Sequence, residues 1–153
     1  MLEFRACPVD EDPAASLVQG MRDELAVMYD GLELDGAHMP KAGPAQLSPP
    51  QGAFIVGEQD GVAVCCGGIK RLSDRACEIK RMFVVEQARG RGVARALLEE
   101  LERRAGELGY AIVRLDTGPL QMRAQRMYEH AGYAPIENPN ANPVASFFGE
   151  KRL

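Results

Sequence analysis

The sequence predicts an α/β protein in which a mixed β-sheet is covered by helices. Residues 78–108 have the pattern of a strand, a glycine-containing turn and an amphipathic helix. Two apolar runs flank the dipeptide Asp60-Gly61, which is typical of a β-hairpin. The other segments complete the order strand, helix, loop, three strands, helix, strand, helix and two strands. Such an alternation of strands and helices indicates an α/β sandwich.

Length and composition favour one globular unit. The chain has 153 residues, and we expect residues 1–153 to form a single domain. Its formal charge of −4 argues against a nucleic-acid partner, which requires a basic face. No apolar run approaches the roughly 20 residues that cross a bilayer, and the N-terminus lacks the apolar core of a signal peptide. We therefore expect a cytoplasmic protein with no membrane partner.

The N-terminal third contains one strand, one helix and a long loop. Residues 2–7 alternate between apolar and polar, which predicts a half-buried strand. Asp12 and Pro13 have the residue types of an N-cap and a first helical position, so we expect a helix from Pro13 to Tyr29. Residues 30–52 are rich in glycine and proline and predict a long loop, with a short helix as an option. His38 lies in this loop, where a surface role and a substrate contact both stay open.

The middle of the chain predicts three antiparallel strands and a helix. Residues 53–59 and 62–69 flank the predicted hairpin turn, and a second turn at 73–75 leads into a strand over 76–85. Gly109 suits the left-handed residue that ends the following helix. The apolar stripe of that helix has the spacing i, i+3, i+4, i+7 and consists of Ala94, Leu97, Leu98, Leu101, Ala105 and Leu108.

The C-terminal segments predict the remaining sheet. Residues 111–117 form a strand, and residues 122–131 form a helix that ends at Gly132. Short strands over 133–136 and 146–151 flank a loop rich in proline and asparagine at 137–145. The strands before and after the central helix should be parallel, because such crossover units are right-handed in nearly all proteins.

The four cysteines do not suggest a metal site. They have no C-x-x-C spacing, and the chain contains two histidines, so we expect no bound metal. Cys65 and Cys66 are adjacent in an apolar run, where cysteine usually serves as a small buried hydrophobe. A catalytic thiol is the alternative, but no candidate base lies nearby in the sequence. Free thiols also fit a reducing compartment.

The turn before the central helix is a candidate anion site. That helix begins within Gly90-Arg91-Gly92, so its unpaired N–H groups and positive dipole end point into the turn. Glycine lets a phosphate approach the backbone closely. A tight turn with solvated arginines is the alternative. The P-loop motif is missing, and the dinucleotide motif would need glycine or alanine where Arg95 stands.

The motif Gln87-x-x-Gly90-x-Gly92 is similar to the Q/R-x-x-G-x-G/A signature of the GNAT superfamily of N-acetyltransferases. In that family the turn holds the pyrophosphate of acetyl-coenzyme A. The sequence departs from the pattern at Glu86, where many relatives carry proline. The resemblance covers roughly the C-terminal half and extends in order through residues 78–84, 115–117 and 121–133.

This resemblance implies a mixed, mostly antiparallel sheet with helices on both faces and a central parallel strand pair that splays apart. Acetyl-CoA would be the cosubstrate, and its acetyl group would pass directly to a primary amine of a small molecule or amino acid. Loops near residues 30–50 and 137–145 would set the choice of acceptor. A protein or peptide N-acetyltransferase and a non-catalytic acyl-CoA binding or sensor domain remain as alternatives, and a homodimer stays open.

The resemblance also assigns residues to the cosubstrate. Backbone groups near Phe83 to Val85 would pair with the pantetheine arm, and an N–H of Phe83 or Val84 would stabilise the oxyanion. The implied cosubstrate-binding residues are Phe83, Val84, Val85, Gln87, Arg89, Gly90, Arg91, Gly92, Val93, Ala94, Gln121 and Tyr128.

Two residues are implied for proton transfer. Tyr128 would be the general acid that protonates the leaving thiolate, and a core tyrosine is the alternative. Tyr133 is the rival acid, but it follows Gly132 and should begin the next strand. Glu78 would accept the proton of the amine through water, and an exposed acid at the start of a strand is the alternative.

Overall fold

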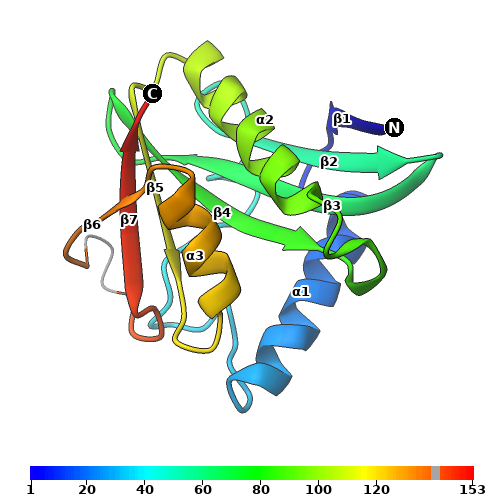
Figure 1. Cartoon of the computed structure of the whole chain (residues 1–153), viewed down its shortest axis with the longest axis horizontal. Coiled ribbons are helices and arrows are strands. Elements are labelled where there is room, and N and C mark those ends of the chain that lie inside the picture. Colours follow the sequence, from blue (N-terminus) through cyan, green and yellow to red (C-terminus); the bar gives the residue numbers. More distant parts are fainter. Residues whose placement is uncertain (139–141) are drawn as a thin grey trace.

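The computed structural model describes residues 1–138 and 142–153 and has one seven-stranded sheet in the order β1-β2-β3-β4-β5-β7-β6 (Figure 1). The β4–β5 pair is parallel and the other pairs are antiparallel. The predicted mixed, mostly antiparallel sheet with a central parallel pair is therefore confirmed. Its strands are β1 (Leu2–Ala6), β2 (Ala53–Gln59), β3 (Val62–Arg71), β4 (Ala76–Val84), β5 (Ile112–Thr117), β6 (Ala134–Pro135) and β7 (Phe147–Arg152).

Helices cover both faces of the sheet. They are α1 (Ala14–Met28), α2 (Val93–Glu107) and α3 (Met122–His130), with a 3-10 turn at Glu86–Ala88. Leu97 and Leu101 of α2 and Tyr128 of α3 pack into one apolar core. Leu17 and Val18 of α1 pack into a second core. Figure 1 shows α2 and α3 lying across the sheet, and α1 apart from them.

Local sequence explains where several elements begin and end. Asp60 and Gly61 have φ angles of 51° and 79°, which is the conformation that a two-residue hairpin turn of this type requires. Asp12 accepts a hydrogen bond of 3.1 Å from the backbone N–H of Ser16, although the helix itself begins at Ala14, one residue later than predicted. Gly109 has a φ of 97° and follows the end of α2, as its position after the apolar stripe predicted.

The long loop over residues 30–52 contains no helix or strand, so the optional short helix does not form there. The loop is nevertheless anchored to the protein, because Ala42 and Leu47 are buried in the core beneath α1. The loop therefore packs against the body of the protein.

A β-bulge interrupts β4 in its middle. Cys66 pairs with Phe83 and Gly68 pairs with Lys80, so Arg81 and Met82 lie opposite the single residue Gly67. Arg81 has a φ of 57°, which is uncommon for any residue other than glycine. The bulge lies at the centre of the sheet and changes the direction of consecutive side chains there.

All four cysteines are free and buried, and the burial of Cys65 and Cys66 confirms the prediction made for them. Burial raises the pKa of Cys65 to about 11 and that of Cys77 to about 12, so these thiols stay protonated at neutral pH. In the part of the chain that the structure describes, none of the helices combines the length and the apolar character of a membrane span.

Candidate active site

The centre of the sheet opens where β4 and β5 part. The two strands pair from Ala76 with Ile112 to Glu78 with Arg114, and no further pairs follow. Figure 1 shows the strands diverging beyond this point. A cavity of about 110 Å³ lies in the gap, lined by residues 79–82 of β4, residues 115–117 of β5 and Tyr128 of α3. Residues of α1 and of the long loop form its opposite wall.

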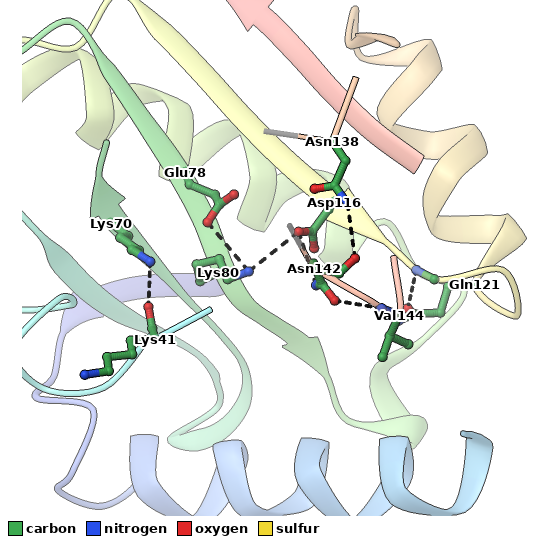
Figure 2. A network of polar contacts seen from close by, with 10 residues as sticks. Lys41, Lys70, Glu78, Lys80, Asp116, Gln121, Asn138, Asn142 and Val144 are labelled. Atoms are coloured by element: carbon green, nitrogen blue, oxygen red, sulfur yellow. Dashed lines mark hydrogen bonds and ion pairs between the residues drawn. The ribbon is translucent and has the colours of Figure 1, made fainter. Parts of the chain in front are cut away.

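A buried network of charges crosses this gap (Figure 2). The ammonium nitrogen of Lys80 lies 3.6 Å from Glu78 Oε1 and 3.7 Å from Asp116 Oδ2. The side chain of Glu78 is 1% exposed and that of Asp116 is 13% exposed. Asp116 and Lys80 line the cavity, whereas Glu78 does not. Glu78 is thus no exposed acid at a strand start, and of the two carboxylates Asp116 has direct access to the cavity.

The loop after β6 docks onto Asp116. Asn142 Nδ2 lies 3.4 Å from Asp116 Oδ2, and Asn142 Oδ1 accepts the backbone N–H of Val144 at 3.0 Å. Asn138 Nδ2 donates to the backbone oxygen of Asn142 at 3.3 Å (Figure 2). Asn142 and Val144 line the cavity, while residues 139–141 of the loop predicted to set the acceptor lie outside the described residues.

Tyr128, the predicted general acid, lies on the cavity wall. Its hydroxyl is 3.8 Å from Met82 Sδ, and burial together with the nearby Asp116 charge raises its pKa to about 12. The phenol therefore keeps its proton at neutral pH. Tyr133 points elsewhere, because its hydroxyl donates to Glu102 of α2 at 2.7 Å. Tyr133 is also absent from the cavity wall.

The glycine turn presents bare backbone to solvent. Gly90 and Gly92 have φ angles of 77° and 80°, and a Cβ atom at either position would meet no atom within 4 Å. Helix α2 begins at Val93, so the N–H groups of its first turn lack acceptors within the helix. Gln87 and Arg91 are exposed around this turn, Val93 is buried beneath it, and Ala94 is half-buried.

Arg89 does not project from the turn as a free cation. Its Nε donates to the backbone oxygen of Val84 at 2.9 Å, and its Nη2 lies 2.7 Å from Glu24 of α1. The guanidinium also lies over the ring of Phe83, 5.7 Å from its centre. Arg89 thus ties the glycine turn to the end of β4 and to α1.

The direction of the backbone at the end of β4 distinguishes the three predicted pantetheine contacts. The N–H of Val85 donates to Val64 of β3 at 2.9 Å. Successive backbone N–H groups point to opposite sides of a strand. The N–H of Phe83 therefore also points toward β3, and the N–H of Val84 points into the gap. The bond from Arg89 to the Val84 carbonyl agrees with this direction. Val84 is therefore the residue of the three with backbone groups on the open side.

Gln121 and Tyr29 join the two walls of the cavity at one end. Gln121 Oε1 accepts the N–H of Gly118 at 2.9 Å and lies 3.3 Å from the Tyr29 hydroxyl. That hydroxyl also accepts the N–H of Leu120 at 3.1 Å. A Cβ atom on Gly118 would clash with the Tyr29 ring and hydroxyl, so a larger residue there would displace Tyr29.

Sequence reasoning missed several cavity residues. Asp116 shows one signal, because it stands at the C-terminal end of a strand that was predicted to be parallel to its neighbour, where ligands often bind. Tyr29 and Asn142 carry no comparable sequence signal. His38 is exposed and does not line the cavity, although its neighbours Met39 and Pro40 do.

Comparison with known sequences supports an acetyltransferase relationship. The model described as the acetyltransferase (GNAT) family matches residues 19–133. An IAA acetyltransferase of Azospirillum brasilense is 35% identical over 111 residues, which is 70% of this chain and 72% of the relative. The uncharacterized N-acetyltransferase YjgM of Escherichia coli is 32% identical over 93 residues, 59% of this chain and 56% of the relative. The chain thus spans between about half and three quarters of these relatives.

Solved structures share the whole fold. A protein from Klebsiella pneumoniae assigned as an acyl-CoA N-acyltransferase superposes with a TM-score of 0.78 and 25% identity, covering 100% of this chain and 98% of that chain. A GNAT family acetyltransferase from Elizabethkingia anophelis with acetyl-CoA bound has a TM-score of 0.70 and 14% identity. The match covers 99% of this chain and 98% of that chain. The second likeness shows a common fold.

Proposed function

The chain belongs to the GNAT family of acetyltransferases, and we propose that it transfers the acetyl group of acetyl-CoA directly to a primary amine of a small molecule or amino acid. The observation that carries this proposal is the gap between β4 and β5, which lies beside the glycine turn and leads to Tyr128. This arrangement supports a proposal in which the phosphates of acetyl-CoA bind at the glycine turn and its thioester reaches the cavity beside Tyr128.

The shape of this path fits acetyl-CoA. The open backbone at Gly90 and Gly92, with the first N–H groups of α2, suits the pyrophosphate. The N–H of Val84 is directed into the gap, where it can pair with the pantetheine arm or stabilise the oxyanion. Gln121 supports the loop at the end of the gap through its bond to Gly118. Arg91 and Gln87 lie exposed beside the phosphate position.

The reaction needs no covalent enzyme intermediate. The neutral amine nitrogen attacks the thioester carbon, and a C–N bond forms while the carbonyl oxygen becomes an oxyanion near Val84. The C–S bond then breaks, the amide forms, and the thiolate takes the proton of the Tyr128 hydroxyl. The proton lost by the amine passes to a carboxylate, and solvent exchange restores Tyr128. Amine and thioester thus become amide and thiol.

Asp116 is better placed than Glu78 to receive the amine proton. Asp116 lines the cavity, while the carboxylate of Glu78 lies behind the ammonium group of Lys80. We assign Glu78 the role of holding Lys80 in place, and Asp116 the role of base. The original assignment of Glu78 as base would require a water path around Lys80.

The test is an acceptor screen with acetyl-CoA that measures free thiol release and identifies the acetylated product by mass. Transfer to small amines is the expected result. Binding of acetyl-CoA without transfer to small amines or peptides would favour the non-catalytic sensor instead. Transfer to peptides alone would favour the peptide N-acetyltransferase.

A further inference from the structure

A second charged cluster lies beside the cavity, on the side of α1 and the long loop. Arg22 of α1 and Arg81 of β4 both contact Asp35 of the loop. Arg22 Nη2 lies 2.9 Å from Asp35 Oδ2, and Arg81 Nη2 lies 3.5 Å from Asp35 Oδ1. Two guanidinium groups therefore share one carboxylate.

Arg81 is an unusual residue at this place. Its side chain is 6% exposed, and it enters the cavity wall from the bulge in β4. Burying a guanidinium is costly unless its donors are satisfied. The contact to Asp35 is longer than a good charge-assisted hydrogen bond, and the side chain of Asp35 is itself 59% exposed. The ion pair with Asp35 thus compensates the buried cation weakly.

Both guanidinium groups have unused donor atoms. Nε of Arg81 and Nε of Arg22 are buried and have no hydrogen-bond partner among the described residues. A guanidinium offers five N–H donors in a fork that matches a carboxylate. The pair therefore has the capacity to bind an anionic group in addition to Asp35, or in its place.

The two clusters place different charged groups on the cavity wall. In the first cluster Asp116 and Lys80 line the cavity, so this part of the wall offers a carboxylate beside a cation. Arg22 and Arg81 enclose one anion, Asp35, so the second cluster has an excess of positive charge. Arg81 is the member of this cluster that lines the cavity, and Arg22 and Asp35 adjoin it. The wall between them includes the apolar side chains Leu25, Leu32, Leu34 and Met39.

We propose that the acceptor carries a carboxylate as well as its amine, and that Arg81 and Arg22 bind this carboxylate while the amine faces Asp116. This inference rests on the proposed acetyl transfer and names its substrate class, a free amino acid or close analogue with an apolar side chain. Asp35 occupies the carboxylate position of the free protein and yields it to the acceptor.

The test compares free L-amino acids with their amides as acceptors, with acetyl-CoA fixed and each product identified by mass. Leucine, methionine and phenylalanine are tested first, each together with its amide. 3-Methylbutylamine serves as an amine that has no carbonyl group. We expect kcat/KM to be about tenfold or more higher for the acid than for the amide. The amine of an amide is less basic and more often neutral, so intrinsic reactivity works against this result.

Two variants assign the preference to the arginines. Arg81→Gln should lower the acid-to-amide ratio of kcat/KM by about tenfold or more, and Arg22→Gln should lower it in the same direction. The Arg22→Gln variant is included because the Arg22 side chain is 39% exposed, so its replacement should not prevent folding. Arg75→Gln in the exposed turn before β4 is the matched control, and its ratio should not change.

Equal or better use of the amides and of 3-methylbutylamine would overturn the carboxylate site while leaving acetyl transfer intact. An acid preference that survives in both Arg81→Gln and Arg22→Gln would overturn the assignment to these residues. Failure to acetylate any amine would refute this inference together with the proposed function, and calorimetry with acetyl-CoA would then show whether the cosubstrate still binds.

Discussion

The two sides of the proposed active site are built in different ways. The proposed cosubstrate side consists mainly of backbone, and its parts from Val84 to Ala94 are nearly contiguous in sequence. The proposed acceptor side consists of charged side chains, which come from α1, the long loop, β4, β5 and the loop before β7. A site made of backbone depends on local conformation, whereas a site made of side chains depends on tertiary structure. Substitutions on the two sides should therefore have separable effects.

Tyr128 is the proposed general acid on the cavity wall, and its loss should have the largest effect. Tyr128→Phe removes the proton donor and should lower kcat by about 10²-fold or more, with little change in folding. Since burial raises the pKa of Tyr128 to about 12, the alkaline limb of the wild-type kcat profile should not arise from this group below about pH 10. Steady-state kinetics and acetyl-CoA calorimetry test both points. A kcat within a factor of two of wild type, with chemistry rate-limiting, would make Tyr128 a core residue.

The two carboxylates of the acceptor side should differ. Asp116→Asn should lower kcat/KM by about 10²-fold at neutral pH, with partial recovery at higher pH, where more of the amine is neutral in solution. Glu78→Gln should lower activity less but destabilise the fold by about 1–3 kcal/mol, because it removes a partner of buried Lys80. Kinetics and denaturant titration on both variants distinguish the roles. The reverse ranking of activities would restore Glu78 as the base.

A bulky residue in the glycine turn should affect the cosubstrate side selectively. Gly92→Leu should weaken acetyl-CoA binding by about tenfold, about 1.4 kcal/mol, because the side chain obstructs the phosphate. Gly61→Leu is a matched control in the β2–β3 hairpin. Gly61 and Gly92 have φ angles of 79° and 80°, and at neither would a Cβ meet an atom within 4 Å. Both variants should lose similar stability, so equal calorimetric affinities would place the phosphates elsewhere.

Stability should fall as the pH rises above about 9, whichever side is altered. The pKa of Cys65 is raised from 9.0 to about 11 and that of Cys77 from 9.0 to about 12, both mainly by burial. Above pH 9 the unfolded chain loses thiol protons that the folded chain keeps, so the free energy of unfolding decreases. The decrease is on the order of 3 kcal/mol for Cys65 and on the order of 4 kcal/mol for Cys77 once the pH passes each folded pKa. Urea titrations from pH 7 to 11 measure it. The decrease should be smaller in Cys65→Ala.

The smallest effect is expected for the thiols in catalysis. Cys65 and Cys66 are buried in opposite cores, and neither lines the cavity. Cys65→Ala and Cys66→Ala should therefore retain kcat and KM within about a factor of two. Complete loss of transfer by a folded variant would show that a thiol takes part.

The difference between the two sides also explains what could be predicted from sequence. Two glycines before an amphipathic helix predict a phosphate site, because positive φ angles and free N–H groups arise from adjacent residues. The sheet order and the place of Tyr128 came from the family resemblance. Fold class, hairpin turn and parallel pair were all predicted and are confirmed.

The acceptor side was not predictable in the same way. Asp116 becomes a cavity residue because β5 lies beside β4 and diverges from it, and Arg22 meets Asp35 because the long loop folds back onto α1. Each of these residues, taken alone, is an ordinary charge on a strand or helix. Their chemistry depends on neighbours that are distant in sequence.

The bulge in β4 also has an evolutionary consequence. Lys80 pairs with Gly68 and Phe83 with Cys66, so the strands would match if one residue between Lys80 and Phe83 were absent. Removing Arg81 would thus preserve the alternation of side chains on both flanks, and the two apolar cores would keep their residues. The guanidinium can be gained or lost as a single-codon insertion or deletion. Relatives that differ in length by one residue at this point would be candidates for a different acceptor on an otherwise unchanged sheet.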